Sequence, residues 1–308
     1  MFDLVGVGNP VYDSIITPLS RTNGRVLSGC STNACLAAKK LGLGKVGLVG
    51  CVGPEFEAGF RCDMGGFGIE VSVGTASTGT GGFQLIYDEK GDRTLDVLGV
   101  AGGISSKDFP EEFLQSRVII IGPILGEVDR DLIEFLRYST SSELFLDPQG
   151  LIRSVGVDKR IIHNCDRGDF AKIAQQVDFV KPNEFESRII TGETDPVLGL
   201  CRLREMGVKL PIITLAERGS LLLEGDVLHR IPPYPTKAID PTGAGDVYAG
   251  SFVTYYEHGG TLEESSLYAS AAASIMVEQV GPGFLLSERD VKERMNSIRD
   301  RVVTEALP

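Results

Sequence analysis

Short apolar runs alternate with helix-periodic stretches along most of this chain. The apolar runs predict strands at residues 4–7, 46–50, 118–121, 144–147, 178–180 and 212–215. The stretches between them predict helices at residues 33–41, 129–138, 184–191 and 196–206, and two long amphipathic patterns follow at 262–280 and 287–303. Because the strands lack polar alternation, we expect both faces of their sheet to be buried. This alternation predicts an α/β fold, with a mostly parallel central sheet between two layers of helices.

Two segments break this rhythm. Residues 12–28 are polar and favour β-structure, and residues 72–100 contain two β-rich arms around the polar turn 88–92, as a hairpin does. We expect both segments to form a small β-sheet lid over the carboxyl edge of the main sheet, with a plain surface hairpin as the alternative. The sequence has no internal repeat and no linker, so we predict a single domain over residues 1–308.

Composition narrows the classes of function. The 308 residues carry a net charge of −12, which argues against a nucleic-acid-binding surface, because phosphate contacts need clustered Lys and Arg. The apolar runs are too short to span a bilayer, and the N-terminus has no signal-peptide pattern. We therefore expect a cytoplasmic protein without a membrane partner. Six cysteines without a Cys-x-x-Cys pair, beside three histidines, indicate reduced thiols rather than a metal site.

The strongest chemical signal is the run Asp240-Pro241-Thr242-Gly243-Ala244-Gly245-Asp246, which leads into a helical pattern of small residues. Small residues at this point let consecutive backbone N–H groups converge at a helix N-terminus, where the dipole favours negative charge. Asp246 would then lie at the rim of an anion pocket, which is unusual unless the carboxylate accepts a proton. A phosphoryl-transfer site needs both parts, donors for the migrating group and a base for the attacking hydroxyl. The alternative is a glycine-rich turn in which Asp246 only complements the helix dipole.

This run resembles the second signature of the ribokinase-like, or PfkB, family of carbohydrate kinases. Four other stretches resemble family motifs and follow in the family's order: residues 8–13, 28–42, 181–186 and 214–219. The second of these, Ser28-Gly29-Cys30-Ser31-Thr32-Asn33-Ala34-Cys35, has serine where the family usually begins with glycine. In the last, Ala216 stands where glycine is usual. The matches extend from residue 6 to about residue 283.

The resemblance implies a ribokinase-like three-layer α/β/α fold and transfer of the γ-phosphoryl group of ATP, with Mg²⁺, to a small hydroxyl acceptor. It implies Asp246 as the general base and the N–H groups of Gly243, Ala244 and Gly245 as donors to the migrating group. The remaining implied roles are acceptor binding by Asp13, Asn33 and Gly29, nucleotide binding by Asn183, Thr214 and Gly219, and an indirect contact of Glu186 with magnesium through water.

Side-chain chemistry is compatible with these roles, and each has a structural alternative. Asp13 can accept hydrogen bonds from two hydroxyls, and Asn33 can both donate and accept. Equally, Asp13 could be a turn residue and Asn33 an ordinary helix cap. Asn183 and Glu186, three residues apart, also have the spacing of a capping box.

Missing motifs exclude a P-loop kinase and disfavour a dinucleotide-dependent oxidoreductase. The sequence has no P-loop and no Gly-x-Gly-x-x-Gly after its first strand. For the acceptor we favour a sugar or polyol. A nucleoside remains open, because Tyr12 and Phe83 near the predicted lid could stack on a base, and a non-catalytic ligand-binding relative is a further alternative. Exposed strand edges in the lid suggest a homodimer formed through it.

Overall fold

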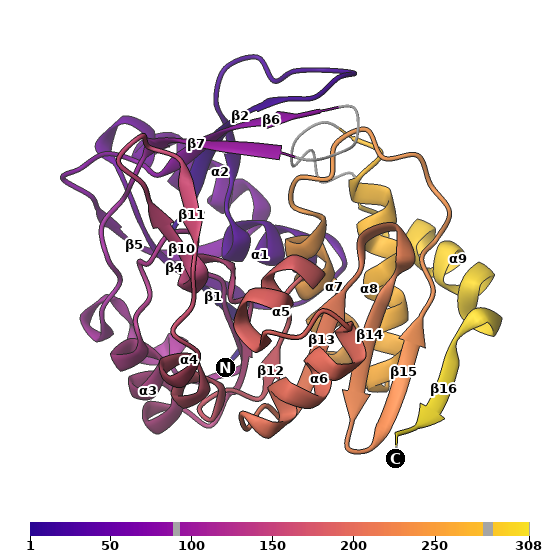
Figure 1. Ribbon diagram of the computed structural model, residues 1–308. Helices are drawn as coiled ribbons and strands as arrows, with labels where there is room; N and C mark the ends of the chain where they lie inside the picture. Colours follow the sequence, from indigo (N-terminus) through magenta and orange to yellow (C-terminus); the bar gives the residue numbers. More distant parts are fainter. Residues whose placement is uncertain (89–92, 280–285, 308) are drawn as a thin grey trace.

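The computed structural model describes residues 1–88, 93–279 and 286–307 (Figure 1). Within them a large central sheet crosses the molecule. Its strands follow the order β16 (Val303–Ala306), β15 (Val227–Ile231), β14 (Ser220–Glu224), β13 (Leu210–Thr214), β12 (Phe179–Val180), β9 (Glu143–Leu146), β8 (Ser116–Ile121), β1 (Phe2–Val7), β4 (Val46–Val52) and β5 (Ile69–Thr75). The strands from β5 to β13 pair in parallel, and β14, β15 and β16 extend the sheet in antiparallel pairing.

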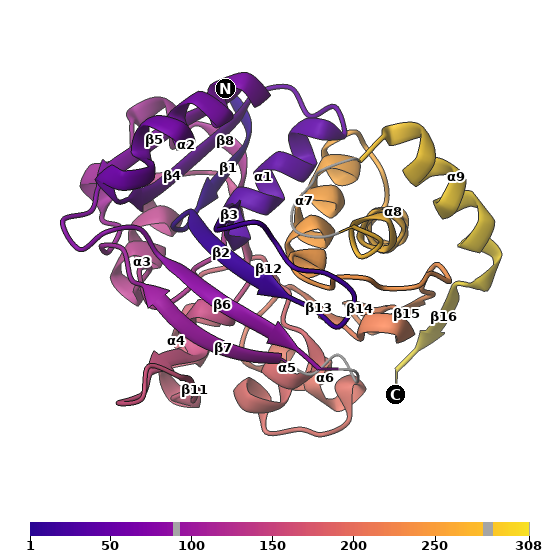
Figure 2. The same cartoon turned by 90° about the horizontal axis from the view of Figure 1, so that it is seen from above.

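Helices cover both faces of this sheet, as Figure 2 shows. One layer contains α1 (Cys30–Lys40), α2 (Pro54–Phe67), α7 (Ala244–Glu257), α8 (Leu262–Met276) and α9 (Glu288–Ile298). The other contains α3 (Arg130–Ser139), α4 (Arg167–Ala174), α5 (Glu184–Thr191) and α6 (Pro196–Glu205). Consecutive residues of β1 divide between the layers, since Leu4 packs in the first core and Val5 in the second, both without exposure. The predicted three-layer α/β fold is confirmed.

A second, four-stranded sheet has the order β3 (Val26–Ser28), β2 (Val11–Ile16), β6 (Gly82–Tyr87) and β7 (Arg93–Gly99) (Figure 1). We call it the small sheet. A hairpin of β10 (Arg153–Val155) and β11 (Ile161–His163) joins its β7 edge through a bridge between Asp96 and Arg160. Short 3₁₀ helices cover Ser106–Asp108, Glu111–Phe113, Gln149–Ile152, Ala216–Arg218 and Arg299–Arg301.

The small sheet occupies less of the second predicted segment than residues 72–100. Residues 69–75 form β5 of the large sheet, because the chain leaving α2 returns beside β4 in a parallel β-α-β unit. β5 lies at the edge of the large sheet, so some of its residues are exposed. In the sequence, such a partly exposed edge strand looks the same as a strand of a lid. The predicted turn at 88–92 lies mostly outside the described residues.

Several helix ends also differ from prediction. α1 begins at Cys30 rather than at residue 33, with Gly29 as its N-cap. The last amphipathic pattern predicts a helix to residue 303, but α9 ends at Ile298, a 3₁₀ helix follows at Arg299–Arg301, and the chain then forms β16. Pairing with β15 gives this terminal segment backbone partners that the sequence pattern does not reveal. α8 ends at Met276, and the predicted end at residue 280 lies outside the described residues.

The carboxyl ends of the parallel strands meet at one edge of the large sheet, beside the N-terminus of α7 (Figure 1). Ligands of open α/β sheets bind at this edge. In the described part of the chain no helix is long and apolar enough to cross a membrane. The cysteines are all free thiols.

Candidate active site

The Gly243–Asp246 run forms the beginning of α7. Gly243 is the N-cap residue, and its φ of 78° lies in the left-handed region that glycine tolerates best. A Cβ at Gly243 would lie 3.0 Å from Nδ2 of Asn33, and one at Gly245 would lie 3.2 Å from Nζ of Lys181. The glycines therefore let two polar side chains approach the backbone of the first turn, where the N–H groups lack intrahelical partners.

The Asp246 carboxylate lies in this first turn and receives hydrogen bonds from two other elements. Nδ2 of Asn33 on α1 donates to Oδ2 at 2.8 Å, and Nε2 of Gln149 donates to Oδ1 at 3.5 Å. Burial raises the pKa of Asp246, and the nearby charge of Asp147 raises it further, whereas the Asn33 hydrogen bond and the Lys181 charge act in the opposite direction. An aspartate with a raised pKa is a stronger base than an ordinary aspartate.

A buried ion pair lies beside this carboxylate. Nζ of Lys181 is 2.8 Å from Oδ2 of Asp147, and both side chains are only 3% exposed. The two residues follow Val180 and Leu146, which are register partners in β12 and β9, so strand pairing brings them together. Burial alone would lower the pKa of Lys181, but the charges of Asp147 and of Glu186 raise it above its usual value.

Asn183 and Glu186 form a capping box at the start of α5. Oδ1 of Asn183 accepts the Glu186 N–H at 2.9 Å, and Oε2 of Glu186 accepts the Asn183 N–H at 2.9 Å. The capping box that the spacing of these residues also predicted is therefore present, although Glu186 also lies among charged groups. Burial raises the pKa of Glu186, and the charge of Asp147 adds to this effect.

Thr214 and Gly219 flank a tight loop after β13. The Thr214 N–H donates to the carbonyl of Pro182 at 3.1 Å, which places this strand end beside the start of α5. At Gly219, φ is 87° and a Cβ would lie 2.0 Å from the carbonyl oxygen of Ile231, so this position requires glycine. Ala216 adopts a φ of 52°, a left-handed conformation at the position where the resemblance leads us to expect glycine.

Asp13 and Gly29 lie in the small sheet and at the start of α1. Asp13 is buried in β2, where its Oδ1 accepts the N–H of Phe83 at 2.8 Å, so it is a strand residue and not a turn residue. Gly29 has a φ of 120°, and a Cβ there would lie 2.9 Å from the carbonyl oxygen of Asn9. Asn33 lies inside α1, and its amide contacts Asp246 instead of capping the helix.

The sequence did not single out several residues that surround Asp246. Asp147 appeared only as the last residue of a predicted strand, Lys181 only as the first residue of the stretch 181–186, and Gln149 not at all. The available signal was a charged residue directly after a buried strand, at the edge where ligands bind. The two aromatic residues considered for base stacking have other contacts, since Tyr12 stacks on Phe56 at 3.9 Å between ring centroids and the Arg153 guanidinium lies 6.0 Å from the Phe83 ring.

Known proteins resemble this chain over most of its length. Residues 16–289 match the family described as pfkB family carbohydrate kinase. A cytidine kinase of Thermococcus kodakarensis is 31% identical over 274 residues, covering 86% of this chain and 92% of that protein. A nucleoside kinase of Methanothermobacter thermautotrophicus is 28% identical over 304 residues, covering 91% of this chain and 90% of that protein.

Solved structures show the same fold at lower sequence identity. A pyrophosphate-dependent kinase in the ribokinase family, complexed with a pyrophosphate analog and myo-inositol, aligns with a TM-score of 0.81 at 20% identity, covering 94% of this chain and 99% of its own. Ribokinase from Thermotoga maritima aligns with a TM-score of 0.78 at 21% identity, covering 96% and 100%. The chain belongs to the PfkB family of carbohydrate kinases and is a phosphotransferase with an alcohol group as acceptor, as its motifs predicted.

Proposed function

We propose that this kinase transfers the γ-phosphoryl group of ATP to a hydroxyl of a small acceptor, with Asp246 as the general base. The observation that carries the proposal is the position of the Asp246 carboxylate, in the first turn of α7 and with a pKa raised by burial. A base of raised pKa at a helix N-terminus combines proton acceptance with donors for a migrating anionic group. The N–H groups of Gly243, Ala244 and Gly245 would serve as these donors.

The charged groups near Asp246 fit a magnesium ion. Asp147, Glu186 and Asp246 set three carboxylates against the ammonium of Lys181, and carboxylate oxygens of Asp147 and Asp246 lie within 4.8 Å of each other. Carboxylate oxygens and retained water are the ligands that Mg²⁺ prefers. In this proposal Asp147 holds the ion and Glu186 contacts it through water. When bound, Mg²⁺ neutralises charge on the nucleotide phosphates.

The rest of the site divides between the two substrates. Asn183 and Gly219 lie in loops after β12 and β13, and Thr214 is the last residue of β13. We assign these three residues to the nucleotide. Asp13, Asn33 and Gly29 lie in the small sheet and α1, and we assign them to the acceptor. The small sheet would act as a lid that excludes water and limits hydrolysis of ATP.

For the acceptor, a nucleoside is now favoured over the sugar or polyol preferred from the motifs. A cytidine kinase and a nucleoside kinase both align with this chain over most of its length and most of their own. A free sugar or polyol remains the second candidate, supported by the fold shared with a ribokinase and with an inositol-bound kinase. ADP release, measured with MgATP and either cytidine, ribose or myo-inositol, would decide between them. Activity with ribose or myo-inositol but none with cytidine would refute the nucleoside assignment.

The role of Asp246 is tested by Asp246→Asn, which keeps the shape of the side chain and removes its basicity. We expect kcat to fall below about a tenth of the wild-type value, since general-base catalysis contributes about 10²- to 10⁴-fold. Asp131→Asn is the matched control, because Asp131 is an exposed aspartate in the first turn of α3. An Asp246→Asn enzyme that keeps more than a tenth of kcat would show that another group accepts the proton.

We also propose a homodimer formed through the small sheet. Ile86 on β6 and Leu98 on β7 are 39% and 45% exposed, and such apolar side chains on a sheet favour coverage by a partner. Light scattering at tens of micromolar would test this, and a monomeric mass would contradict it.

A further inference from the structure

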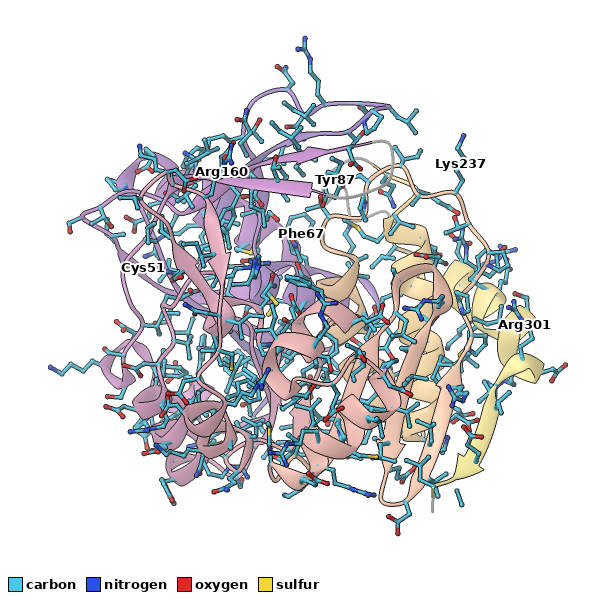
Figure 3. The ribbon with its side chains drawn as sticks, in the orientation of Figure 1. Cys51, Phe67, Tyr87, Arg160, Lys237 and Arg301 are labelled. Carbon is cyan, nitrogen blue, oxygen red and sulfur yellow. The ribbon has the colours of Figure 1, made fainter. Side chains whose placement is uncertain are left out.

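A hydrogen bond joins the small sheet to the loop that leads into α7. Oη of Tyr87, at the end of β6, lies 2.9 Å from Oγ1 of Thr242, and 155 positions of sequence separate the two residues. Tyr87 is 6% exposed and Thr242 is 5% exposed, so the contact is buried. Figure 3 shows Tyr87 beneath the small sheet, near the loop before α7.

Thr242 is well placed to control the first turn of α7. Its own N–H donates to Oδ1 of Asp240 at 2.9 Å, and the next residue, Gly243, is the N-cap of the helix. Asp246 lies four residues after Thr242. A displacement of Thr242 therefore moves the backbone donors of the first turn and the base together.

The other end of β6 contacts a candidate acceptor residue. The N–H of Phe83 on β6 donates to the buried carboxylate of Asp13 on β2. The strand thus runs from Asp13, assigned to the acceptor, to Tyr87, which contacts the loop before the phosphoryl site. Because β6 pairs with β2 on one side and β7 on the other, it moves as part of the sheet.

We propose that Tyr87 is a positioning residue for phosphoryl transfer. Its hydroxyl fixes Thr242, and with it the N-terminal turn of α7, when the small sheet lies over the site. This inference rests on the function proposed above for that turn. It assigns to the small sheet a direct part in aligning the reacting groups, in addition to covering them.

Tyr87→Phe removes only the hydroxyl and keeps the ring. The ring can stay in place, because it belongs to an apolar cluster with Val11, Ile15 and Leu85 of the small sheet. Thr242 then loses a buried partner, which costs stabilisation of the aligned state. We expect kcat to fall about tenfold, the equivalent of one buried hydrogen bond. The KM for ATP should change less than about twofold, and more ADP should form per phosphorylated acceptor because water enters more easily.

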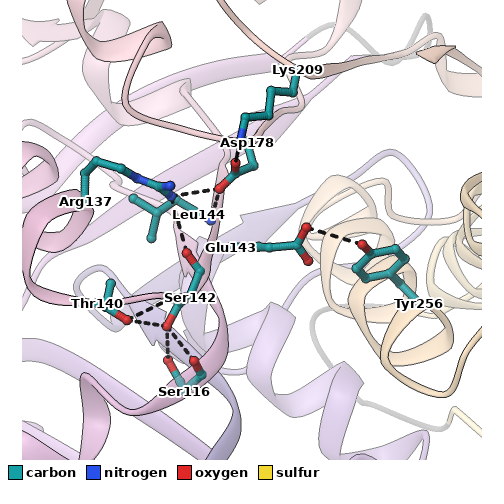
Figure 4. A network of polar contacts seen from close by, with 9 residues as sticks. All are labelled: Ser116, Arg137, Thr140, Ser142, Glu143, Leu144, Asp178, Lys209 and Tyr256. Carbon is teal, nitrogen blue, oxygen red and sulfur yellow. Dashed lines mark hydrogen bonds and ion pairs between the residues drawn. The ribbon is translucent and has the colours of Figure 1, made fainter. Parts of the chain in front are cut away.

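Tyr256→Phe is the matched control. Tyr256 lies near the other end of α7, and its hydroxyl donates to Oε1 of Glu143 at 3.3 Å (Figure 4). It also loses one hydroxyl hydrogen bond from a tyrosine, yet its kcat should stay within about twofold of wild type. The kinetic assay uses MgATP with cytidine, and with ribose if cytidine is not phosphorylated.

Hydrogen exchange provides a readout that needs no acceptor. Backbone amides in a peptide covering residues 239–247 should exchange faster in Tyr87→Phe than in wild type, and at the wild-type rate in Tyr256→Phe. A Tyr87→Phe, Thr242→Val double variant should be no slower in catalysis than the more impaired single variant, because both changes break the same bond.

Unchanged exchange in residues 239–247, a Tyr87→Phe kcat within twofold of wild type, or a double variant whose loss is the product of the two single losses would each overturn the proposal. Failure of the proposed function looks different. In that case Asp246→Asn retains its activity, or wild-type protein releases no ADP with any acceptor, while the exchange measurement still reports on the contact between Tyr87 and Thr242.

Discussion

Replacing Lys181 by methionine removes the positive charge from the cluster of carboxylates around Asp246. Lys181 and Asp147 are 3% exposed in their side chains and 2.8 Å apart, so the change leaves Asp147 buried without its partner. Breaking a buried ion pair in this way typically costs about 3–5 kcal/mol. We expect the free energy of unfolding of Lys181→Met to fall by that amount at neutral pH.

The double variant Asp147→Asn, Lys181→Met is the control for this reasoning. It removes both charges, so no uncompensated charge stays buried, and its stability should lie within about 2 kcal/mol of wild type. Recovery of stability on adding the second substitution would show that the cost arises from the unpaired, buried charge of Asp147, and not from the lost packing of the lysine stem.

The loss in Lys181→Met should also depend on pH. Lys181 lowers the pKa of both Glu186 and Asp246, so these raised pKa values rise further without it. An acid with a raised pKa binds more protons in the folded state than in the unfolded state, and stability therefore falls as pH rises from the unfolded to the folded pKa. The deficit should be larger at pH 8 than at pH 5.5.

Urea denaturation followed by far-UV circular dichroism measures these differences, since the chain has no tryptophan for fluorescence. A loss below about 1 kcal/mol, an equal loss in the double variant, or a deficit that shrinks with rising pH would refute the reasoning from the buried pair.

Two further predictions concern the pH dependence of the reaction and the loop after β13. Because the base must be deprotonated and burial raises the pKa of Asp246, kcat/KM should rise with pH through a midpoint above the pKa of an ordinary aspartate. A pH–rate profile with a midpoint at or below the usual aspartate value would exclude Asp246 as the titrating base. Gly219→Ala should lower the free energy of unfolding by about 2–4 kcal/mol, because its Cβ would lie 2.0 Å from the Ile231 carbonyl oxygen. Ala216→Gly is the opposite case and should raise stability by about 0–1 kcal/mol, since relief of the left-handed backbone outweighs the entropy of glycine, and urea denaturation of both variants checks this pair.

Sequence alone determined the elements whose signals are local. The apolar runs at β1, β4, β8, β9, β12 and β13 and the periodic stretches at α3, α5 and α6 follow from short-range patterns, and α5 has the predicted bounds. The Gly243–Asp246 run likewise combines turn residues, a helix start and a carboxylate within a few positions. These features predicted the α/β fold and the PfkB family of carbohydrate kinases.

The strand order, the end of α9 and the extent of the small sheet were not readable in this way. β5 and β16 join the large sheet because neighbours distant in sequence offer paired backbone groups. A weakly apolar segment gives no sign of which partner will satisfy its N–H and C=O groups, and the partner decides whether it becomes a strand.

The surroundings of Asp246 were decided by tertiary structure. Asn33 reaches it across 213 positions of sequence, and Lys181 meets Asp147 only because β12 and β9 are neighbours in register. Tyr87 meets Thr242 only because one sheet lies over the other. Local sequence sets which residues carry the chemistry, but their distances, burial and pKa values depend on long-range packing, which short-range propensities do not encode.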